Sequence, residues 1–152
     1  MIIRRFKKED AIEISRIIKE CFLSLDMGRH SKVGINLQIE NNSPDNLIAR
    51  SKKINYYVAE INRKLTGICG FDQNKIHTLF IDLHYHKQGI GSKLLLRIIK
   101  EAKNKGITKL TTWSTMYAYP FYGKSGFHRL KEIKLPEGKE EIILIEMEKK
   151  LE

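Results

Sequence analysis

Hydrophobic residues recur along the chain with two different periods, and the period changes from one segment to the next. A period near 3.6 residues predicts an amphipathic helix, and a period of two predicts a half-buried strand. The chain opens with a β-rich segment from Ile2 to Phe6, and Glu9 and Asp10 then suit the positive end of a helix. That helix has one apolar face, formed by Ala11, Ile14, Ile17, Ile18, Cys21 and Phe22.

The segment from Met27 to Asn42 carries a pattern that fits two structures. A strand would explain the alternation of Val33, Ile35, Leu37 and Ile39. A short helix would instead align Val33, Leu37 and Glu40, so both structures stay open. Ser43-Pro44-Asp45 predicts the start of another helix, because serine caps a helix and proline is tolerated in its first turn.

Three β-rich segments with short connections occupy the middle of the chain. They run over Asn55 to Ile61, Leu65 to Phe71 and Lys75 to Asp82. The connections between them, Asn62-Arg63-Lys64 and Asp72-Gln73-Asn74, are rich in turn residues. Consecutive strands joined in this way predict an antiparallel meander.

A long amphipathic helix is predicted after Gly89. Its apolar stripe consists of Ile90, Leu94, Leu95, Ile98, Ile99 and Ala102. Gly106 is expected to end this helix, because glycine adopts the left-handed conformation found after helix ends. The β-rich segment from Lys109 to Trp113 comes next, and the order strand, helix, strand predicts a parallel crossover.

The last third of the chain completes a mixed sheet. Ala118 to Gly123 is predicted as a short helix or turn, and Phe127 to Ile133 and Glu141 to Met147 as two closing strands. The whole order is one strand, helices, three strands, a helix, a strand, a helix and two strands. This order predicts an α/β fold in which helices cover the faces of a mixed sheet.

Length and composition are those of one globular domain spanning residues 1–152. Of the 152 residues, 41% are hydrophobic and 30% are charged, which favours a folded chain over a disordered one. The net charge of +10 suits an anionic partner such as nucleic acid, an acidic surface or a phosphorylated cofactor. Because the lysines are scattered, with no arginine-rich arm or zinc-finger spacing, we do not expect a nucleic-acid partner.

The two cysteines and the absence of long apolar runs indicate a compartment. Cys21 and Cys69 make no disulfide framework and are interpreted as small apolar core residues in a reducing environment. No run approaches the roughly 20 apolar residues of a membrane span, and the first residues do not resemble a signal peptide. We therefore expect a cytoplasmic protein without a membrane partner.

A glycine-containing turn joins the third middle strand to the long helix. Gly89 and Gly91 allow the backbone to approach a ligand closely, and the first amides of a helix lack internal partners. Together they predict an anion site, although an ordinary helix start is the plain alternative. A dinucleotide fingerprint is excluded because Leu94 occupies its third glycine position, and a P-loop is excluded because Ala118 occupies its first.

A cluster of aromatic residues follows the next strand, and here the chain resembles a family. The turn around Gly89 and Gly91 resembles the signature of the GNAT superfamily of acyl-CoA-dependent N-acetyltransferases. The later aromatic signature of that family is met by Ala118, Phe121, Tyr122, Gly126 and Phe127. Two signatures separated by a helix and a strand are more specific than either alone. Three residues depart from the family pattern. His86 stands where Gln or Arg is usual, Leu83 stands where proline is common, and Ser114 stands where Asn is common.

The resemblance implies a GNAT-like, mostly antiparallel central sheet of about seven strands with helices on both faces. It also implies acetyl-CoA as co-substrate. The residues expected to contact it are Leu79, Phe80, Ile81, His86, Lys87, Gln88, Gly89, Ile90, Gly91, Ser92, Ser114 and Tyr119. The first three would pair with the pantetheine arm through their backbone, and Lys87 to Ser92 would bind the pyrophosphate.

The catalytic residues implied are fewer. Tyr122 matches the family's general acid, which protonates the departing thiolate; the alternative is that it only packs on the cofactor. For the general base, His77 is the first candidate because histidine titrates near neutrality. Asp72, Glu60 and a water chain remain alternatives. His84 and His86 alone are too few ligands for a metal, and none is expected.

The predicted activity is acetyl transfer to a primary amine of a small molecule or peptide. A non-catalytic acyl-CoA sensor with the same fold is the alternative, and homodimers are common among similar proteins. The acceptor would be set by the segment from Phe22 to Arg50. That segment shows no clear charge preference, because it mixes Asp26, Arg29, His30, Lys32 and Glu40.

Overall fold

A computed structural model describes residues 1–136, 139 and 141–152. Its strands form one sheet in the order β1-β2-β3-β4-β5-β7-β6. Their bounds are β1 (Ile2–Arg5), β2 (Asn55–Ile61), β3 (Lys64–Asp72), β4 (Lys75–Ile81), β5 (Lys109–Ser114), β6 (His128–Leu135) and β7 (Ile142–Lys150). The helical elements are η1 (Lys8–Asp10), α1 (Ala11–Ser24), α2 (Lys32–Asn41), α3 (Pro44–Arg50), η2 (Leu83–Tyr85), α4 (Ile90–Asn104) and α5 (Tyr119–Lys124). The predicted seven-stranded, mostly antiparallel sheet is confirmed.

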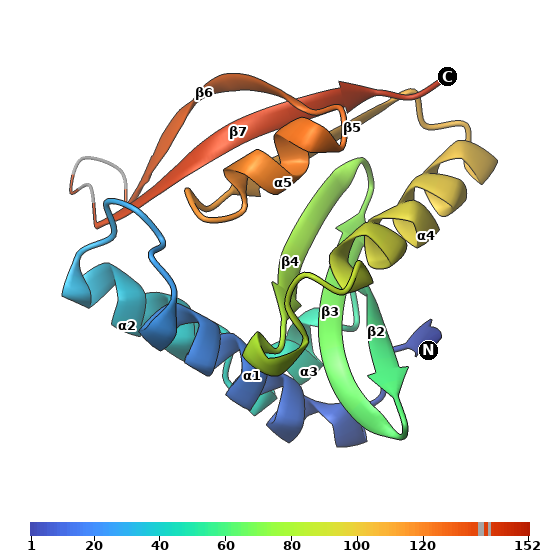
Figure 1. Ribbon diagram of the computed structural model, residues 1–152. Coiled ribbons are helices and arrows are strands. Elements are labelled where there is room, and N and C mark those ends of the chain that lie inside the picture. Colours follow the sequence, from blue (N-terminus) through green and yellow to red (C-terminus); the bar gives the residue numbers. More distant parts are fainter. Residues whose placement is uncertain (137–138, 140) are drawn as a thin grey trace.

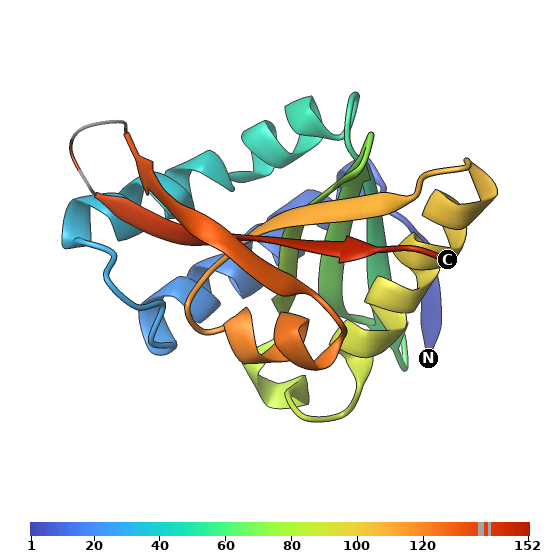
Figure 2. The ribbon, with the colours of Figure 1, turned by 90° about the horizontal axis from the view of Figure 1, so that it is seen from above.

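The sheet divides at its one parallel pair. β4 and β5 are paired only at Lys75 with Thr111 and at Ile76 with Thr112, whereas every other neighbouring pair is antiparallel. Beyond these two residue pairs, β4 and β5 diverge, and Figure 1 shows the two halves of the sheet separating between them. Figure 2 shows the same strands from above. The parallel crossover through α4 is therefore confirmed, but the paired stretch is short.

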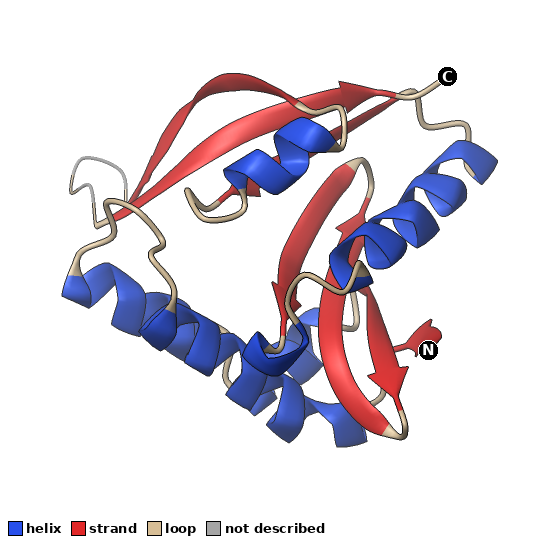
Figure 3. Cartoon of the chain, viewed as in Figure 1, coloured by secondary structure: helices blue, strands red, loops and turns tan. Residues whose placement is uncertain are grey.

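Helices cover both faces of the sheet (Figure 3). One core lies beneath α1 and includes all of its predicted apolar residues except Ala11, together with Tyr56, Val58 and Ile68 of the central strands. The other core lies beneath α4, whose Leu94 and Ile98 are fully buried. Burying each such side chain stabilises the fold by about 1.5–3 kcal/mol. The two amphipathic helices predicted from the sequence thus cover opposite faces of one sheet.

The ambiguous segment from Met27 to Asn42 forms helix α2, so its interpretation as a strand is wrong. Ser31 caps the helix by accepting a hydrogen bond from Gly34 N (3.0 Å). Gly34 is needed because α2 crosses the start of β7 closely: a Cβ there would lie 1.9 Å from Glu141 O. The alternating apolar residues are only partly buried or exposed, which explains why neither period was clear.

Both cysteines are free and buried, as predicted. Burial raises the pKa of Cys21 to about 12, and burial also raises the pKa of Cys69. Such thiols stay protonated at neutral pH and behave as small apolar groups. In the described part of the chain, no helix is long and apolar enough to span a membrane.

Candidate functional site

A β-bulge reshapes β4 next to the point where the sheet divides. Gly70 of β3 pairs with His77 and Ile68 pairs with Phe80, so β4 contains one extra residue over this stretch. Thr78 takes up the extra length in the left-handed conformation, with φ of 54°. Bulges re-aim side chains. Here the bulge puts Leu79 against the core under α4 and Phe80 against the core under α1.

The turn after β4 has an unusual backbone at two residues. Gly89, with φ of 79°, is the residue before α4, and Lys87 is also left-handed, with φ of 62°. The amides of Ile90, Gly91 and Ser92 precede the first intrahelical bond, which Lys93 N donates to Gly89 O (3.1 Å). No side chain caps this helix. The turn therefore presents unpartnered donors at a helix start, which is the arrangement that binds phosphate oxygens.

Asp82 fixes the base of this turn. Its carboxylate accepts hydrogen bonds from His84 N (2.9 Å) and from Arg16 of α1 (3.2 Å), and it lies 3.0 Å from His84 Nδ1. Burial alone would raise the pKa of Asp82, but the bonds from His84 and Arg16 lower it below its usual range. The charged carboxylate thus ties the turn to α1.

His86 bridges the two sides of the divided sheet. Its Nε2 lies 2.8 Å from Ile81 O at the end of β4, and its Nδ1 lies 3.1 Å from the Tyr117 hydroxyl, which follows β5. A carbonyl can only accept, so Nε2 carries the proton and neutral Nδ1 accepts from the phenol. The histidine found in place of Gln or Arg therefore has a structural role of its own.

A cavity of about 570 Å³ lies over this turn. Seven of the predicted cofactor residues besides Leu79 and Phe80 line it: Ile81, His86, Lys87, Gly89, Ile90, Gly91 and Ser92. Its opposite wall comes from the segment after β5, including Tyr117 and Phe121. We call it the turn cavity.

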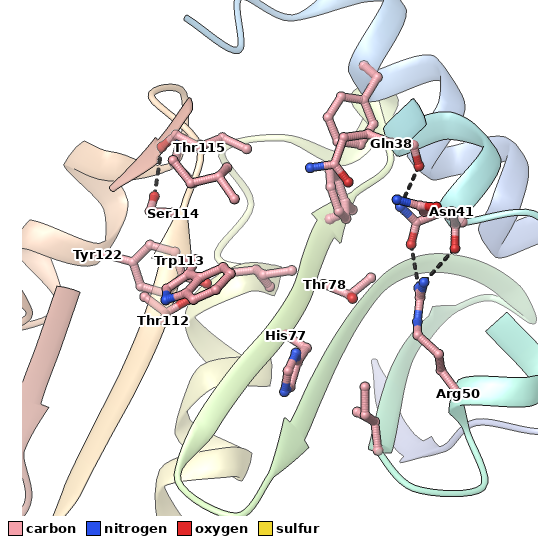
Figure 4. A pocket seen from close by; sticks show the side chains of 17 residues that line it. Gln38, Asn41, Arg50, His77, Thr78, Thr112, Trp113, Ser114, Thr115 and Tyr122 are labelled. Carbon is pink, nitrogen blue, oxygen red and sulfur yellow. Dashed lines mark hydrogen bonds between the residues drawn. The ribbon is translucent and has the colours of Figure 1, made fainter. Parts of the chain in front are cut away.

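A second cavity, of about 280 Å³, opens between β4, β5 and the helices α2 and α3 (Figure 4). Tyr122 and Thr112 lie on one side of it, His77 and Thr78 along β4, and Arg50 on the far side. We call it the helical cavity. Leu79, Phe80, Thr115 and Ala118 line both cavities. The two cavities therefore meet where β4 and β5 have separated.

Tyr122 is buried in the wall of the helical cavity, with 3% of its surface exposed. Its ring packs edge-on against Phe121 and Phe127 at centroid distances of 5.4 and 5.2 Å. Burial raises the pKa of its phenol well above the ordinary value, and a contact with the Thr112 hydroxyl offsets only part of that rise. The phenol stays protonated at neutral pH and can donate a proton.

His77 lines the same cavity and is partly buried. Burial lowers the pKa of its imidazole, and the ammonium of Lys75 lowers it further, while Asp72 acts in the opposite direction. The ring is therefore neutral at pH 7 and can accept a proton. Neither Asp72 nor Glu60 lines either of these two cavities. The carboxylate of Glu60 instead lies 3.3 Å from the guanidinium of Arg4 on β1.

Three predicted cofactor residues lie away from the turn cavity. Gln88 is exposed and Tyr119 is half-buried, and neither lines either cavity. Ser114 lines the helical cavity, where its hydroxyl donates to Thr115 O (2.7 Å). In the described residues, no group of three or more His, Cys, Asp or Glu side chains could hold a metal.

Several residues that line the helical cavity were not named individually from the sequence, although four of them lie in the segment from Phe22 to Arg50 that was expected to set the acceptor. They are Gln38, Asn41, Asn42 and Arg50 from the helices and Thr112 and Trp113 from β5. Ser43-Pro44 signalled the start of α3, and this signal could have placed Arg50 near its end. No local pattern shows that this end faces β4.

Comparison with known proteins supports the resemblance seen in the sequence. A family model for an acetyltransferase (GNAT) domain matches residues 29–151. The uncharacterized N-acetyltransferase YafP of Escherichia coli is 31% identical over 80 residues, 53% of this chain and 50% of YafP. The uncharacterized N-acetyltransferase MJ1207 of Methanocaldococcus jannaschii is 28% identical over 93 residues, 52% of this chain and 41% of MJ1207. The chain thus spans about half the length of the curated relatives it matches.

Solved structures are similar over nearly the whole chain. A GCN5-related N-acetyltransferase from Rhodopseudomonas palustris has a TM-score of 0.90 at 19% identity, covering 99% of this chain and 95% of that one. The PaiA N-acetyltransferase from Thermoplasma acidophilum, in complex with coenzyme A, has a TM-score of 0.77 at 26% identity, covering 98% of both chains. YncA from Salmonella typhimurium, with acetyl-CoA, has a TM-score of 0.68 at 21% identity, covering 100% and 94%.

Proposed function

The chain belongs to the GNAT acetyltransferase family, and on that premise we propose that it transfers an acetyl group from acetyl-CoA to a primary amine. Residues 1–152 would act as one acetyltransferase domain. The observation that carries the proposal is the junction of the two cavities. There a protonated phenol and a neutral imidazole line one cavity, next to a turn with free helix amides.

The turn cavity has the features that a pyrophosphate and a pantetheine arm require. The left-handed Lys87 and Gly89 and the free amides of α4 can hold phosphate oxygens. After Ile76, the edge of β4 that faces β5 pairs with no strand among the described residues, so the backbone around Leu79 can pair with an extended ligand. Lys87 and Lys93 add positive charge near the helix start. Bound acetyl-CoA would supply the acetyl group as a thioester.

Tyr122 is proposed as the general acid. A thiolate leaving group is stabilised when a neighbouring acid protonates it. The buried phenol of Tyr122 is protonated at neutral pH, and its aromatic neighbours Phe121 and Phe127 hold the ring. The proton would pass from the phenol to the sulfur as the carbon–sulfur bond breaks.

His77 is proposed as the general base. An amine acceptor is protonated near neutral pH and attacks only after losing a proton. His77 and Tyr122 line the same cavity, and the lowered pKa keeps the imidazole neutral. The amine nitrogen would give one proton to His77 directly or through water and then attack the thioester carbon. The second proton, lost from this nitrogen as the amide forms, would restore the Tyr122 phenol, and His77 would release its proton to solvent.

Release of free CoA tests this function. The protein is incubated with acetyl-CoA and a panel of primary amines comprising amino acids, polyamines, aminoglycosides and lysine peptides, and free thiol is followed with time. Acceptor-dependent thiol release, with acetylated amine found by mass spectrometry, supports the enzyme. Tight acetyl-CoA binding without release from any acceptor would instead support the alternative, a non-catalytic acyl-CoA sensor.

A further inference from the structure

The polar wall of the helical cavity contains no carboxylate among the residues that the structure describes. Its neutral polar side chains come from Gln38, Asn41, Asn42, Thr78, Thr112, Ser114 and Thr115. Its ionisable side chains are those of Arg50, His77 and Tyr122. A second ammonium group on an acceptor would therefore find no countercharge here, whereas an anionic group would find a guanidinium.

Arg50 is a partly buried cation whose partners are all neutral. Its Nε donates to the Tyr56 hydroxyl (3.1 Å), its Nη1 to Asn41 O and its Nη2 to Asn42 Oδ1 (2.6 Å). In the described part of the chain, no carboxylate oxygen lies within 4.0 Å of it. A guanidinium has five N–H groups, so Nη1 and Nη2 each retain one N–H group that these three bonds do not use.

The absence of a carboxylate partner distinguishes Arg50 from the two other partly buried arginines that the structure describes. Arg4 and Arg97, which are also partly buried, each pair with a carboxylate: Arg4 with Asp10 at 2.8 Å and Arg97 with Glu101 at 3.8 Å. An arginine removed from water without a countercharge is costly unless a ligand supplies one. Its planar fork matches a carboxylate in geometry.

The charges around His77 favour the same kind of ligand. Lys75, Arg50 and Lys53 all act on the imidazole as cations, and Asp72 is the one opposing carboxylate among its described charged neighbours. Lys53 lies 4.0 Å from Asp72 and so partly offsets it. The field inside the helical cavity is therefore positive, which attracts an anion and repels an acceptor with several ammonium groups.

We propose that the acceptor is a small amine that also carries a carboxylate, such as a free amino acid, and that Arg50 binds this carboxylate. The inference rests on the proposed acetyl transfer and specifies its substrate class. Arg50 would hold the carboxylate at the α3 side of the cavity, and the amine would then point toward His77 and the junction with the turn cavity. A cavity of about 280 Å³ suits a ligand of that size.

Matched pairs of acceptors test the proposal. Each L-amino acid is compared with its carboxamide, which keeps the amine and the size but removes the negative charge. We expect kcat/KM to favour the acids by about tenfold or more, as a charged hydrogen bond to guanidinium allows. In Arg50→Gln the preference should disappear, and in Arg50→Lys it should survive in part. Lys52→Gln, which removes an exposed charge two residues away and outside the cavity, should leave it unchanged.

A binding measurement separates this inference from the proposed function. Trp113 is the sole tryptophan and lines the helical cavity, so its fluorescence reports occupancy without turnover. N-acetyl-L-alanine should change the emission saturably in the parent protein. The dissociation constant of N-acetyl-L-alaninamide, measured in the same way, should be at least tenfold higher. If no acceptor releases CoA, the acetyl transfer is wrong, while carboxylate-dependent fluorescence would still support the Arg50 site.

Two results would contradict the proposed binding of a carboxylate by Arg50. Equal rates for acids and amides, or a preference for polyamines, would overturn the inference and leave acetyl transfer intact. Because Arg50 also joins α2 to α3 through Asn41 and Asn42, circular dichroism and coenzyme A affinity are measured for each variant. If Arg50→Gln does not fold, the comparison of acid and amide in the parent protein and in Arg50→Lys still decides the question.

Discussion

The turn cavity and the helical cavity meet at the same residues of β4 but are built differently. One wall of the turn cavity comes from a single stretch between Leu79 and Ser92, and the groups proposed to bind a ligand there are mostly backbone amides. The helical cavity draws its side chains from elements that are distant in sequence, namely α1, α2, α3, β4, β5, α5 and β7. Backbone groups at a helix start depend little on side-chain identity, whereas a site made of side chains changes with each residue.

On the proposed function, the turn cavity would carry the cofactor binding common to the family, and the helical cavity would set the choice of acceptor. The separation of β4 from β5 after Ile76 creates both cavities at once, because it frees the edge of β4 and opens the space in front of Tyr122. We expect substitutions in the helical cavity to change turnover or acceptor choice. Substitutions in the turn cavity should change cofactor affinity.

Tyr122→Phe should have the largest effect. The ring and its packing against Phe121 and Phe127 remain, but the proton donor is lost, so turnover should fall by roughly 100-fold or more. The dissociation constant for acetyl-CoA, measured by calorimetry, should stay within about twofold. Unchanged turnover, once chemistry is shown to be rate-limiting, would exclude the acid role and leave Tyr122 as a packing residue.

Gly91→Ala should weaken cofactor binding with little change in turnover at saturation. A Cβ at Gly91 would meet Phe121 at 3.5 Å, an ordinary contact, so the protein itself tolerates the methyl group. The same methyl group would hinder a phosphate that binds to the α4 amides. We therefore expect the dissociation constant for acetyl-CoA to rise roughly tenfold, or about 1.4 kcal/mol. Gly123→Ala in α5, where a Cβ meets nothing within 4 Å, is the control. Equal affinities in both variants would place the cofactor elsewhere.

His86→Ala should have a smaller effect, raising the KM for acetyl-CoA a few-fold. The variant loses the bonds to Ile81 O and Tyr117, and each is worth about 1 kcal/mol at most in an exposed turn. His86→Gln can still donate to Ile81 O, so it should recover part of the loss. Steady-state kinetics on both variants measures this. A larger defect in the Gln variant than in the Ala variant would contradict a bridging role.

Lys75→Gln should change only the pH dependence. The Lys75 ammonium lowers the pKa of His77, so removing it raises that pKa. Because the neutral imidazole is the active form, the acidic limb of kcat/KM should move to higher pH while the plateau stays the same. His77→Ala should abolish this limb, and Lys64→Gln, an exposed charge on β3, should leave it in place. An acidic limb that persists in His77→Ala would assign the base to another group or to water.

Much of the fold was predictable because the relevant forces are local. The apolar faces of α1 and α4, the turns between β2, β3 and β4, and the helix end at Gly106 follow from side-chain periodicity and glycine conformation. The turn proposed to bind an anion was predictable for the same reason, since its amide donors belong to consecutive residues. Met27 to Asn42 was not, because helix α2 is only weakly amphipathic and is held by Ser31 and Gly34 against the start of β7.

Sequence patterns alone therefore predicted the order of helices and strands outside Met27 to Asn42, the turn before α4 and the family signatures around Tyr122. The tertiary structure alone decided the bulge at Thr78, the bridge from His86 to Tyr117 and the position of Arg50 across from His77. These features depend on contacts between residues far apart in the chain, and the periodicity of hydrophobic residues within one segment does not indicate such contacts. The proposed cofactor side can thus be inferred from a short segment, whereas the proposed acceptor side forms only when α2, α3 and the divided sheet pack together.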